Sequence, residues 1–436
     1  NAYNFSTGTT VSKSLTIYDI NLAVGSSYYL LWNFNTTGSN SQGIGLDNFV
    51  MTETAYTPPL YWAGPGWTGS GTGGAGTWDG TGGWDSTTAS FGGTAGTVTA
   101  GTVSATGLSF LNTTGAYTLN SGTITLTGAT VSVVTSGVSA TINSVLAGSV
   151  GLTKSGAGTL TISGANTYSG STTVSTGTLI TSGGNGRLSG NTSLTVTSGA
   201  TLTLGGNESA TSLTNSGTIN LGANALTVGA GTSAGNFSGT GGSLTFSNSA
   251  TLSGTNTYTG GTTVNAGTLT VSTTTALPTA GAIAINAASQ LKLNVAGTFG
   301  DPGQTLTLNA DQSTNPVLSI LSSATVTLLS NVELANSTTN RIEPSGGAGV
   351  LTLSGNLTGA GSLLKAASGN LVIIGTANTN TGSTQTGNGT ITVNSGSALG
   401  TGSLTFFQTS TNAATIALNN AAQSVGTLTS SWTAMN

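Results

Sequence analysis

An eleven-residue spacing between an asparagine and a glycine recurs three times in this chain. In each copy an Asn-Thr pair opens a stretch rich in Gly, Ser and Thr, and the closing glycine begins a strand of alternating Thr and apolar residues. The copies run from Asn166 to Gly177, from Asn256 to Gly267 and from Asn378 to Gly389. Self-similarity in short strands and turns is typical of a solenoid, in which each turn buries its apolar face against its neighbours. The spacing therefore predicts a fold of stacked turns.

Short segments from about Gly93 onward alternate apolar residues with Thr or Ser, and Gly or Asn interrupts them. Alternation with a period of two indicates half-buried strands, as in Leu160 to Ser163 and Leu351 to Ser354. No segment has a helical period. We predict an all-β chain that forms a right-handed parallel β-helix, the hand following from the chirality of parallel crossovers. An array of antiparallel sandwiches is the competing architecture.

The composition divides the chain into three parts. Residues 1–56 hold three strand candidates, and YYLLWNF with GIGLDNFVMTE resembles the last strands of jelly-roll domains in bacterial secreted proteins. A jelly roll needs eight strands, so we expect a neighbouring chain or a missing N-terminal part to complete this segment. Residues 57–92 form a linker rich in Pro, Gly and Trp that caps the solenoid. Residues 93–436 form the parallel β-helix.

The composition also excludes several classes of function. Because the chain has no Cys and no His, we expect no cofactor, no metal and no histidine base. Its six Lys and Arg residues are scattered, so no basic stripe is available for nucleic acid. No run approaches the roughly 18 apolar residues of a membrane helix, so we expect no transmembrane segment. We interpret the chain, which begins at Asn1, as a processed or trimmed form of a secreted protein.

A cluster of tryptophans in the Gly-rich linker has two interpretations. Trp62, Trp67, Trp78 and Trp84 lie close together in sequence, and Asp79 follows one of them. Aromatic rings beside acids suit a platform on which sugars stack. A cap that covers the open end of the solenoid explains the same residues, because the terminal turn otherwise exposes strand edges and apolar core. We favour the cap and keep the glycan platform as the alternative.

Residues Lys154 to Ile180, KSGAGTLTISGANTYSGSTTVSTGTLI, resemble the autotransporter-associated β-strand repeat, also called the passenger-associated transport repeat. Ala250 to Val271 lack the lysine, and Lys365 to Val393 carry Asn380 in place of the tyrosine. The resemblance implies a secreted or surface-exposed bacterial β-helix, often part of a longer protein. It also implies structural roles for the shared motif positions, which are Asn166, Tyr168, Gly177, Asn256, Tyr258, Gly267, Asn378 and Gly389.

Charged groups suited to catalysis are scarce. Glu208 is the one acid between Ser86 and Gly300. The remaining acid groupings are Asp79 with Asp85, Asp301 with Asp311, and Glu333 with Arg341 and Glu343. A glycosidase needs paired carboxylates on one face of adjacent turns, and a surface ion pair explains the last group equally well. We therefore predict that the chain is not an enzyme. Repeated Thr-x-Thr strands leave ice binding as a minor alternative, although outward Thr is ordinary in half-exposed strands.

The leading functional hypothesis is a non-catalytic, extracellular structural protein. Its β-solenoid would be a subunit of a bacterial surface fibre, stalk or layer and would associate with other copies of itself. The alternative is an autotransporter-type adhesin passenger that binds glycans or another cell surface. Both hypotheses place the chain outside the cell or on the bacterial surface.

Overall fold

The computed structural model describes most of the chain beyond residue 87. The described residues are 61–62, 67–68, 76–78, 88–190, 192–286, 288–309, 315–321, 323–335, 339–344, 346–396, 399–408, 413–419, 423 and 425–432. All of them belong to the second of two units of the chain, Thr57–Asn436. Residues 1–56 lie outside the described residues, so the jelly-roll-like segment stays a prediction, as do most of the linker and cap predicted for 57–92.

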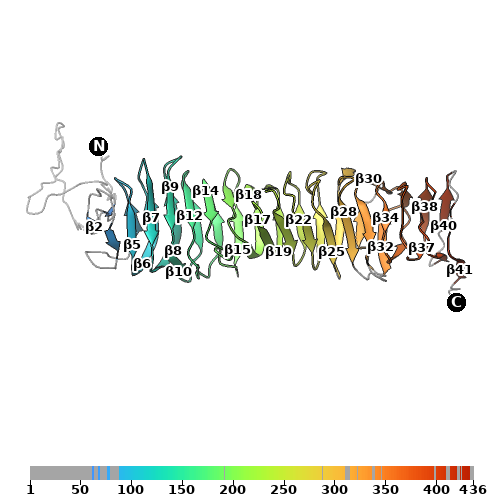
Figure 1. Ribbon diagram of the computed structural model, residues 1–436, viewed down its shortest axis with the longest axis horizontal. Helices are drawn as coiled ribbons and strands as arrows, with labels where there is room; N and C mark the ends of the chain where they lie inside the picture. Colours follow the sequence, from blue (N-terminus) through green and yellow to red (C-terminus); the bar gives the residue numbers. More distant parts are fainter. Residues whose placement is uncertain are drawn as a thin grey trace, which may run out of the picture. The chain divides into compact units, whose positions relative to one another are not determined.

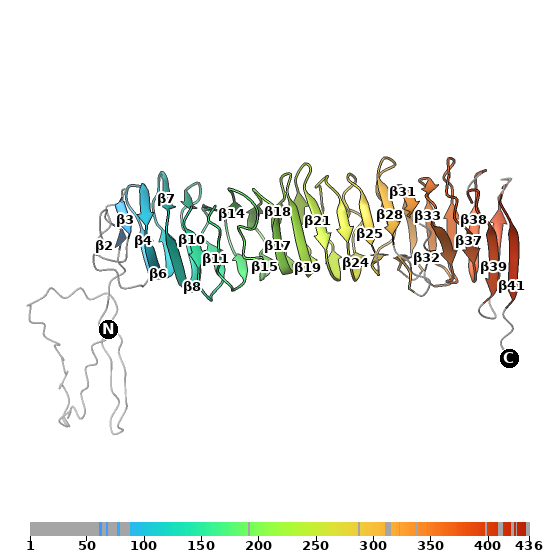
Figure 2. The same cartoon turned by 60° about the horizontal axis from the view of Figure 1, so that its bottom comes forward.

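Parallel β-strands stacked in turns make up the described part of the chain, as Figures 1 and 2 show. All strand pairs are parallel except β1 (Tyr61–Trp62) with β2 (Trp67–Thr68). The strands form about 15 turns and the described residues contain no helix. This confirms the predicted all-β parallel β-solenoid, whereas the hand of the coil stays a prediction.

Each turn has three sides, which the strand pairings define. Side 1 runs through β4 (Thr88–Phe91), β6 (Thr102–Phe110), β8 (Thr123–Val133), β11 (Leu152–Ser155), β13 (Thr172–Val174), β15 (Ser193–Val196), β17 (Glu208–Asn215), β19 (Ala225–Ser233), β22 (Ala250–Leu252), β24 (Thr268–Val271), β26 (Gln290–Leu293), β29 (Leu318–Ile320), β32 (Thr339–Pro344), β35 (Ser362–Lys365), β37 (Thr384–Thr386), β39 (Leu404–Gln408) and β41 (Leu428–Trp432). Side 2 holds β3 (Gly76–Trp78), β5 (Thr97–Ala100), β7 (Ala116–Asn120), β9 (Ser139–Ile142), β12 (Thr159–Ile162), β14 (Thr178–Thr181), β16 (Thr201–Thr203), β18 (Thr218–Asn220), β20 (Asn236–Ser238), β27 (Gly297–Phe299), β30 (Thr325–Leu328), β33 (Val350–Leu353), β36 (Asn370–Ile373), β38 (Gly389–Val393) and β40 (Ala414–Leu418).

Side 3 closes each turn. It holds the N-terminal parts of β6, β8, β17 and β19, which bend onto side 1, together with β10 (Val145–Ala147), β21 (Ser243–Phe246), β23 (Thr262–Val264), β25 (Ile283–Asn286), β28 (Thr305–Asn309), β31 (Asn331–Leu334) and β34 (Leu357–Thr358). Where no strand fills side 3 or side 2, motif loops such as 166–168 and 256–258 take its place through hydrogen bonds to the preceding turn.

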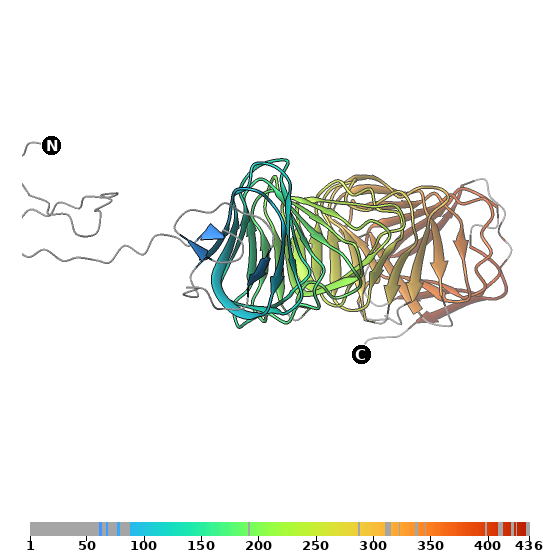
Figure 3. The same cartoon turned by 60° about the vertical axis from the view of Figure 1, so that its left-hand side comes forward.

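Apolar side chains stacked in register form the core, inside the turns of backbone that Figure 3 shows. On side 2 one such ladder runs Leu160, Leu179, Leu202, Ile219 and Phe237, each paired with the next and each fully buried. The outward residues between them are mostly Thr and Ser. Because each inward side chain contacts its equivalents above and below, the apolar burial that stabilises the fold is shared between neighbouring turns.

The length of a turn varies along the solenoid. Thr201 pairs with Thr218, so that turn takes 17 residues, whereas Gly297 pairs with Val326, 29 residues on. The strands keep their register, so the extra residues lie in the corners between sides. The corners are therefore where one turn differs from another, and where side chains outside the core find room.

Candidate functional site

The motif asparagines tie three successive turns together. Asn166 Oδ1 accepts a hydrogen bond from Leu146 N at 2.9 Å, and its Nδ2 donates to Arg187 O at 2.8 Å. Asn256 does the same between Phe237 N (2.8 Å) and Ala276 O (2.6 Å). Both side chains are more than nine-tenths buried. Since a buried amide is costly unless its donor and acceptor are satisfied, each asparagine fixes the turns before and after it.

The third copy divides this task between two residues. Asn378 Oδ1 accepts from Leu357 N at 2.5 Å, but its Nδ2 donates within its own turn, to Gly375 O at 2.9 Å. Asn380, which stands where the other copies have tyrosine, donates to Leu399 O of the next turn at 3.2 Å. The substitution at the tyrosine position thus preserves the link between turns.

The motif tyrosines are core residues. Tyr168 and Tyr258 are fully buried, and each hydroxyl lies within hydrogen-bond distance of a threonine four residues on, Thr172 at 2.7 Å and Thr262 at 2.5 Å. Burial raises the pKa of both hydroxyls, which keeps them neutral at physiological pH. Neither ring has a face open to a ligand.

The motif glycines share one backbone conformation. Gly177, Gly267 and Gly389 have φ values of 67°, 74° and 67°, in the left-handed region that side chains rarely adopt. A Cβ on Gly177 would lie 2.5 Å from both Gly156 O and Gly158 O. The eleven-residue spacing is therefore the distance from the asparagine tie to an obligatory glycine corner.

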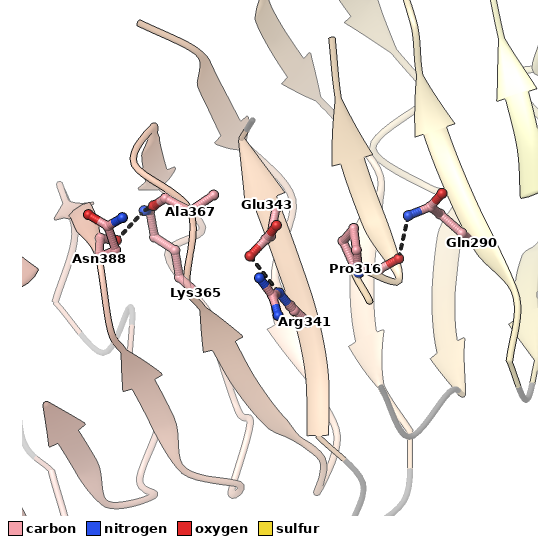
Figure 4. A network of polar contacts seen from close by, with 7 residues as sticks. All are labelled: Gln290, Pro316, Arg341, Glu343, Lys365, Ala367 and Asn388. Carbon is pink, nitrogen blue, oxygen red and sulfur yellow. Dashed lines mark hydrogen bonds and ion pairs between the residues drawn. The ribbon is translucent and has the colours of Figure 1, made fainter. Parts of the chain in front are cut away.

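A buried lysine fills the corner beside two of these glycines. Lys154 is 0 % exposed, and its Nζ donates to Ser155 O, Gly156 O and Thr176 O at 2.7, 2.8 and 3.1 Å. Lys365 repeats the arrangement, since its Nζ donates to Ala367 O and to Asn388 O (2.7 Å), as Figure 4 shows. In both cases the ammonium joins carbonyls of two consecutive turns. Desolvation by burial lowers the pKa of each lysine to about 8, and the nearby Glu343 carboxylate raises that of Lys365 slightly in return.

Phe246 takes the place of the lysine in the second copy. Lys154 pairs with Val174, three residues before Gly177, and Phe246 pairs with Val264, three residues before Gly267. Phe246 is 1 % exposed. This equivalence is not visible in the aligned sequence, because the corner that follows Phe246 is shorter.

The second copy is also rotated by one side of the solenoid. Lys154 and Lys365 lie on side 1, whereas Phe246 lies on side 3. The asparagines differ in the same way. Asn166 lies in a loop stacked on side 3, whereas Asn256 lies in a loop stacked on side 2. The same motif therefore works at different angles around the axis, and its copies build no common face.

Glu208 links two turns as the motif asparagines do, but through a carboxylate. Its two carboxylate oxygens accept hydrogen bonds from Arg187 N at 3.0 Å and Leu188 N at 2.9 Å in the preceding turn. The side chain is 3 % exposed, and burial raises its pKa above the usual range while these hydrogen bonds lower it in part. Glu208 is thus a backbone cap between turns.

The predicted group of Glu333, Arg341 and Glu343 separates into two structural contacts. Arg341 Nε donates to Glu343 Oε1 at 2.5 Å, a partly buried ion pair (Figure 4). Glu333 instead accepts a hydrogen bond from Thr307 of the preceding turn at 3.0 Å. Asp301 accepts from Gly303 N within its own turn, and Asp79, Asp85 and Asp311 lie outside the described residues.

Trp78 lies in the core at the first described turns. It is 1 % exposed, and its ring meets Phe91 edge-on at 5.8 Å, while Phe91 stacks on Phe110 at 5.1 Å. The side chains of Trp62 and Trp67 are not described, and Trp84 lies outside the described residues. The cap and the glycan platform both stay predictions for this segment.

Neither a membrane-spanning helix nor a metal cluster is present in the part of the chain that the structure describes. The described residues contain no helix long and apolar enough to cross a membrane. Nor do they hold three His, Cys, Asp or Glu side chains grouped closely enough for a metal ion.

Comparison with known proteins identifies the repeat. The passenger-associated transport repeat family matches residues 152–180 and 241–271. A segment of 166 residues is 43 % identical to the protein "Adhesin BmaC autotransporter" of Brucella suis biovar 1 (strain 1330), covering 34 % of this chain and 5 % of that protein. The chain therefore spans only a small fraction of its relative's length. No solved structure matches the chain.

The two family matches fall on the first two copies of the motif, the copies in which Asn166, Tyr168, Asn256 and Tyr258 occupy the buried positions described above. The third copy, 365–393, has the same lysine corner and the same left-handed glycine. The solenoid is thus built around passenger-associated transport repeats.

Proposed function

We propose that this chain is a section of a non-catalytic passenger that is secreted or displayed on the bacterial surface and takes part in adhesion. The observation that carries the proposal is the structural use of every described motif residue. The motif asparagines, tyrosines, glycines and lysines all serve to hold neighbouring turns together. The matched repeat family and the relative named as an adhesin support the surface role.

A binding assay tests this function. The purified chain, coupled to beads, is expected to hold eukaryotic or bacterial cells above the level of beads carrying an unrelated β-solenoid. The Arg341→Ala and Glu333→Gln variants should bind cells as well as the parent chain, since their charges serve local contacts. Parent-chain beads that hold no more cells than the unrelated solenoid would contradict the adhesive role, and turnover of a polysaccharide by the parent chain would contradict a non-catalytic one.

Self-association is a second candidate function, and the charge distribution favours it. From residue 88 to 290 the charged residues are Lys154, Arg187 and Glu208, and two of these are buried. A surface of hydroxyls and amides with so little charge offers no electrostatic repulsion between copies. Sedimentation velocity should show concentration-dependent association that changes little with salt. A monomer at every concentration would exclude it.

A further inference from the structure

A shallow groove of about 270 Å³ lies at the corner between sides 2 and 3, over four consecutive turns. Its apolar part consists of Leu329 and Ile374, both half-buried, and the exposed Pro302, and its polar part of Asn331, Ser354, Asn356 and Thr376 beside Gly355. No charged side chain lines it. The groove adjoins the turn from 297 to 326, in which five residues, 300–304, lie at this corner between β27 and β28.

Three polar groups in the groove have unused hydrogen-bonding capacity. Asn356 Oδ1 accepts a hydrogen bond from Ala377 N at 3.0 Å, which fixes the side chain, but its Nδ2 donates to no described atom of the chain. The hydroxyls of Ser354 and Thr376 also make no hydrogen bond within the described residues. A fourth group, Asn331 Nδ2, makes only a long contact of 3.4 Å with Pro302 O.

The equivalent corner of the first repeat shows what a closed corner looks like. Ser163 follows Ile162 as Ser354 follows Leu353, and both serines precede a glycine. Ser163 Oγ donates to Asn143 Oδ1 of the preceding turn, so its hydroxyl is used internally. Ser354 has no such partner. The two corners therefore differ in whether this serine hydroxyl is used within the chain.

We propose that this groove binds a neutral pyranose unit of a glycan, an inference that rests on the proposed adhesive function. A pyranose ring has an apolar face of C–H groups and an edge of hydroxyls. The side chains of Leu329 and Ile374 match the apolar face of the ring. The amide of Asn356 and the hydroxyls of Ser354 and Thr376 match its hydroxyl edge. The absence of charge in the lining disfavours sialylated or sulfated sugars, because no cationic side chain there would offset the free-energy cost of desolvating an anion.

An extended peptide fits the groove less well. The backbone N–H groups of Leu329, Ser354 and Ile374 donate to Phe299 O, Leu328 O and Leu353 O of the preceding turns. No free strand edge remains at this corner for a peptide to extend. Recognition there depends on side chains, which suits a sugar.

The test uses the whole chain and a panel of neutral trisaccharides of glucose, galactose and mannose, with sialylated and sulfated trisaccharides as comparison. Saturation-transfer NMR and calorimetric titration measure binding. We expect a neutral trisaccharide to bind, Asn356→Ala to weaken it about fivefold through loss of one hydrogen bond, and Ser354→Leu to abolish it by filling the groove.

Two variants control for effects on the fold. Asn236→Ala removes the same acceptor bond, from Thr255 N at 3.0 Å, in a corner that the groove does not reach. Ser163→Leu introduces the same bulk at the equivalent corner of the first repeat. Both should bind the trisaccharide within about twofold of the parent chain.

Three outcomes would overturn the inference. These are equal binding by the parent chain and both groove variants, preference for the anionic sugars, and no saccharide binding at all. Because the bead assay measures cell binding separately, beads that hold cells without saccharide binding would leave the adhesive function intact and remove only the groove. Failure of both assays would remove both proposals.

Discussion

Lys154 and Phe246 fill the same corner in two copies of one repeat, and they do so by opposite means. The lysine carries a buried charge held by three carbonyls. The phenylalanine carries no polar atom beyond the backbone and is equally buried. The repeat therefore requires a filled corner, and the chemistry of the filling is free to change.

The length of the corner explains which filling is used. Four residues, 155–158, separate Lys154 from the next strand, and four residues, 366–369, follow Lys365. In the second copy Ser249 lies opposite Thr268, one position before the pair Ala250 and Leu269. Only Ser247 and Asn248 therefore remain in the equivalent corner after Phe246. The longer corners turn backbone carbonyls inward, and these need a donor. In the shorter corner an apolar ring, Phe246, fills the equivalent position.

The largest effect should come from Phe246→Ala. This change removes a fully buried ring from a packed corner, and we expect it to lower the free energy of unfolding by about 4 kcal/mol. Urea denaturation followed by far-ultraviolet circular dichroism measures it. A decrease in the free energy of unfolding of less than about 1 kcal/mol would show that the corner tolerates a cavity. It would then contradict the view that Phe246 and Lys154 fill equivalent corners.

Lys154→Ala should cost somewhat less, about 3 kcal/mol, because it leaves Ser155 O, Gly156 O and Thr176 O without their donor. The same denaturation experiment applies. Lys292→Ala is the matched control, since Lys292 is a half-buried outward residue of β26 with no corner to fill. Equal stability of the two variants would contradict a structural role for the buried ammonium.

Exchanging the corners sharpens the comparison. Lys154→Phe alone should cost about 2 kcal/mol, because the ring satisfies none of the three carbonyls. Replacing residues 155–158 by Ser-Asn in that variant, as in the second copy, should recover about half of the loss. No recovery would mean that corner length does not decide between lysine and phenylalanine.

The smallest effect is a dependence on pH. The pKa of Lys154 and Lys365 is about 8 in the folded chain and 10.5 as the ordinary value. Between these values the unfolded chain binds more protons, so the stability contributed by these sites rises with pH from about 8 to 10.5, whereas below about 8 both states are protonated and the contribution stays at its lower value. The Lys154→Met, Lys365→Met double variant should lack this rise. Above pH 10 the buried tyrosines, whose pKa is raised, oppose it in both proteins.

Much of the fold could be predicted from particular residues. The alternation in Thr159–Ile162 predicted a strand, and the spacing from Asn166 to Gly177 predicted a corner at the glycine. Both predictions were possible because a period of two and a left-handed glycine are local properties. The position of Phe246 could not be predicted, since the shorter corner shifts the alignment. Nor could the link from Asn380 to Leu399, because residues 19 apart in sequence meet only once turn lengths are known.

The candidate groove was beyond sequence analysis for the same reason. Ser163 and Ser354 have the same neighbours in sequence, Ser-Gly after an aliphatic residue, but only one of them faces an open corner. The sequence also left open whether Glu333 shares a face with Arg341 and Glu343, and the structure shows that Thr307, one turn away, is the partner of Glu333.

Hydrogen exchange in Lys154→Met tests the central claim most directly, because it reports each turn separately. If the lysine ties two consecutive turns, amide protection should fall in peptides covering 152–180 and remain unchanged in 241–271, where Phe246 fills the corner. Unchanged protection across 152–180, or an equal loss in both segments, would contradict the account.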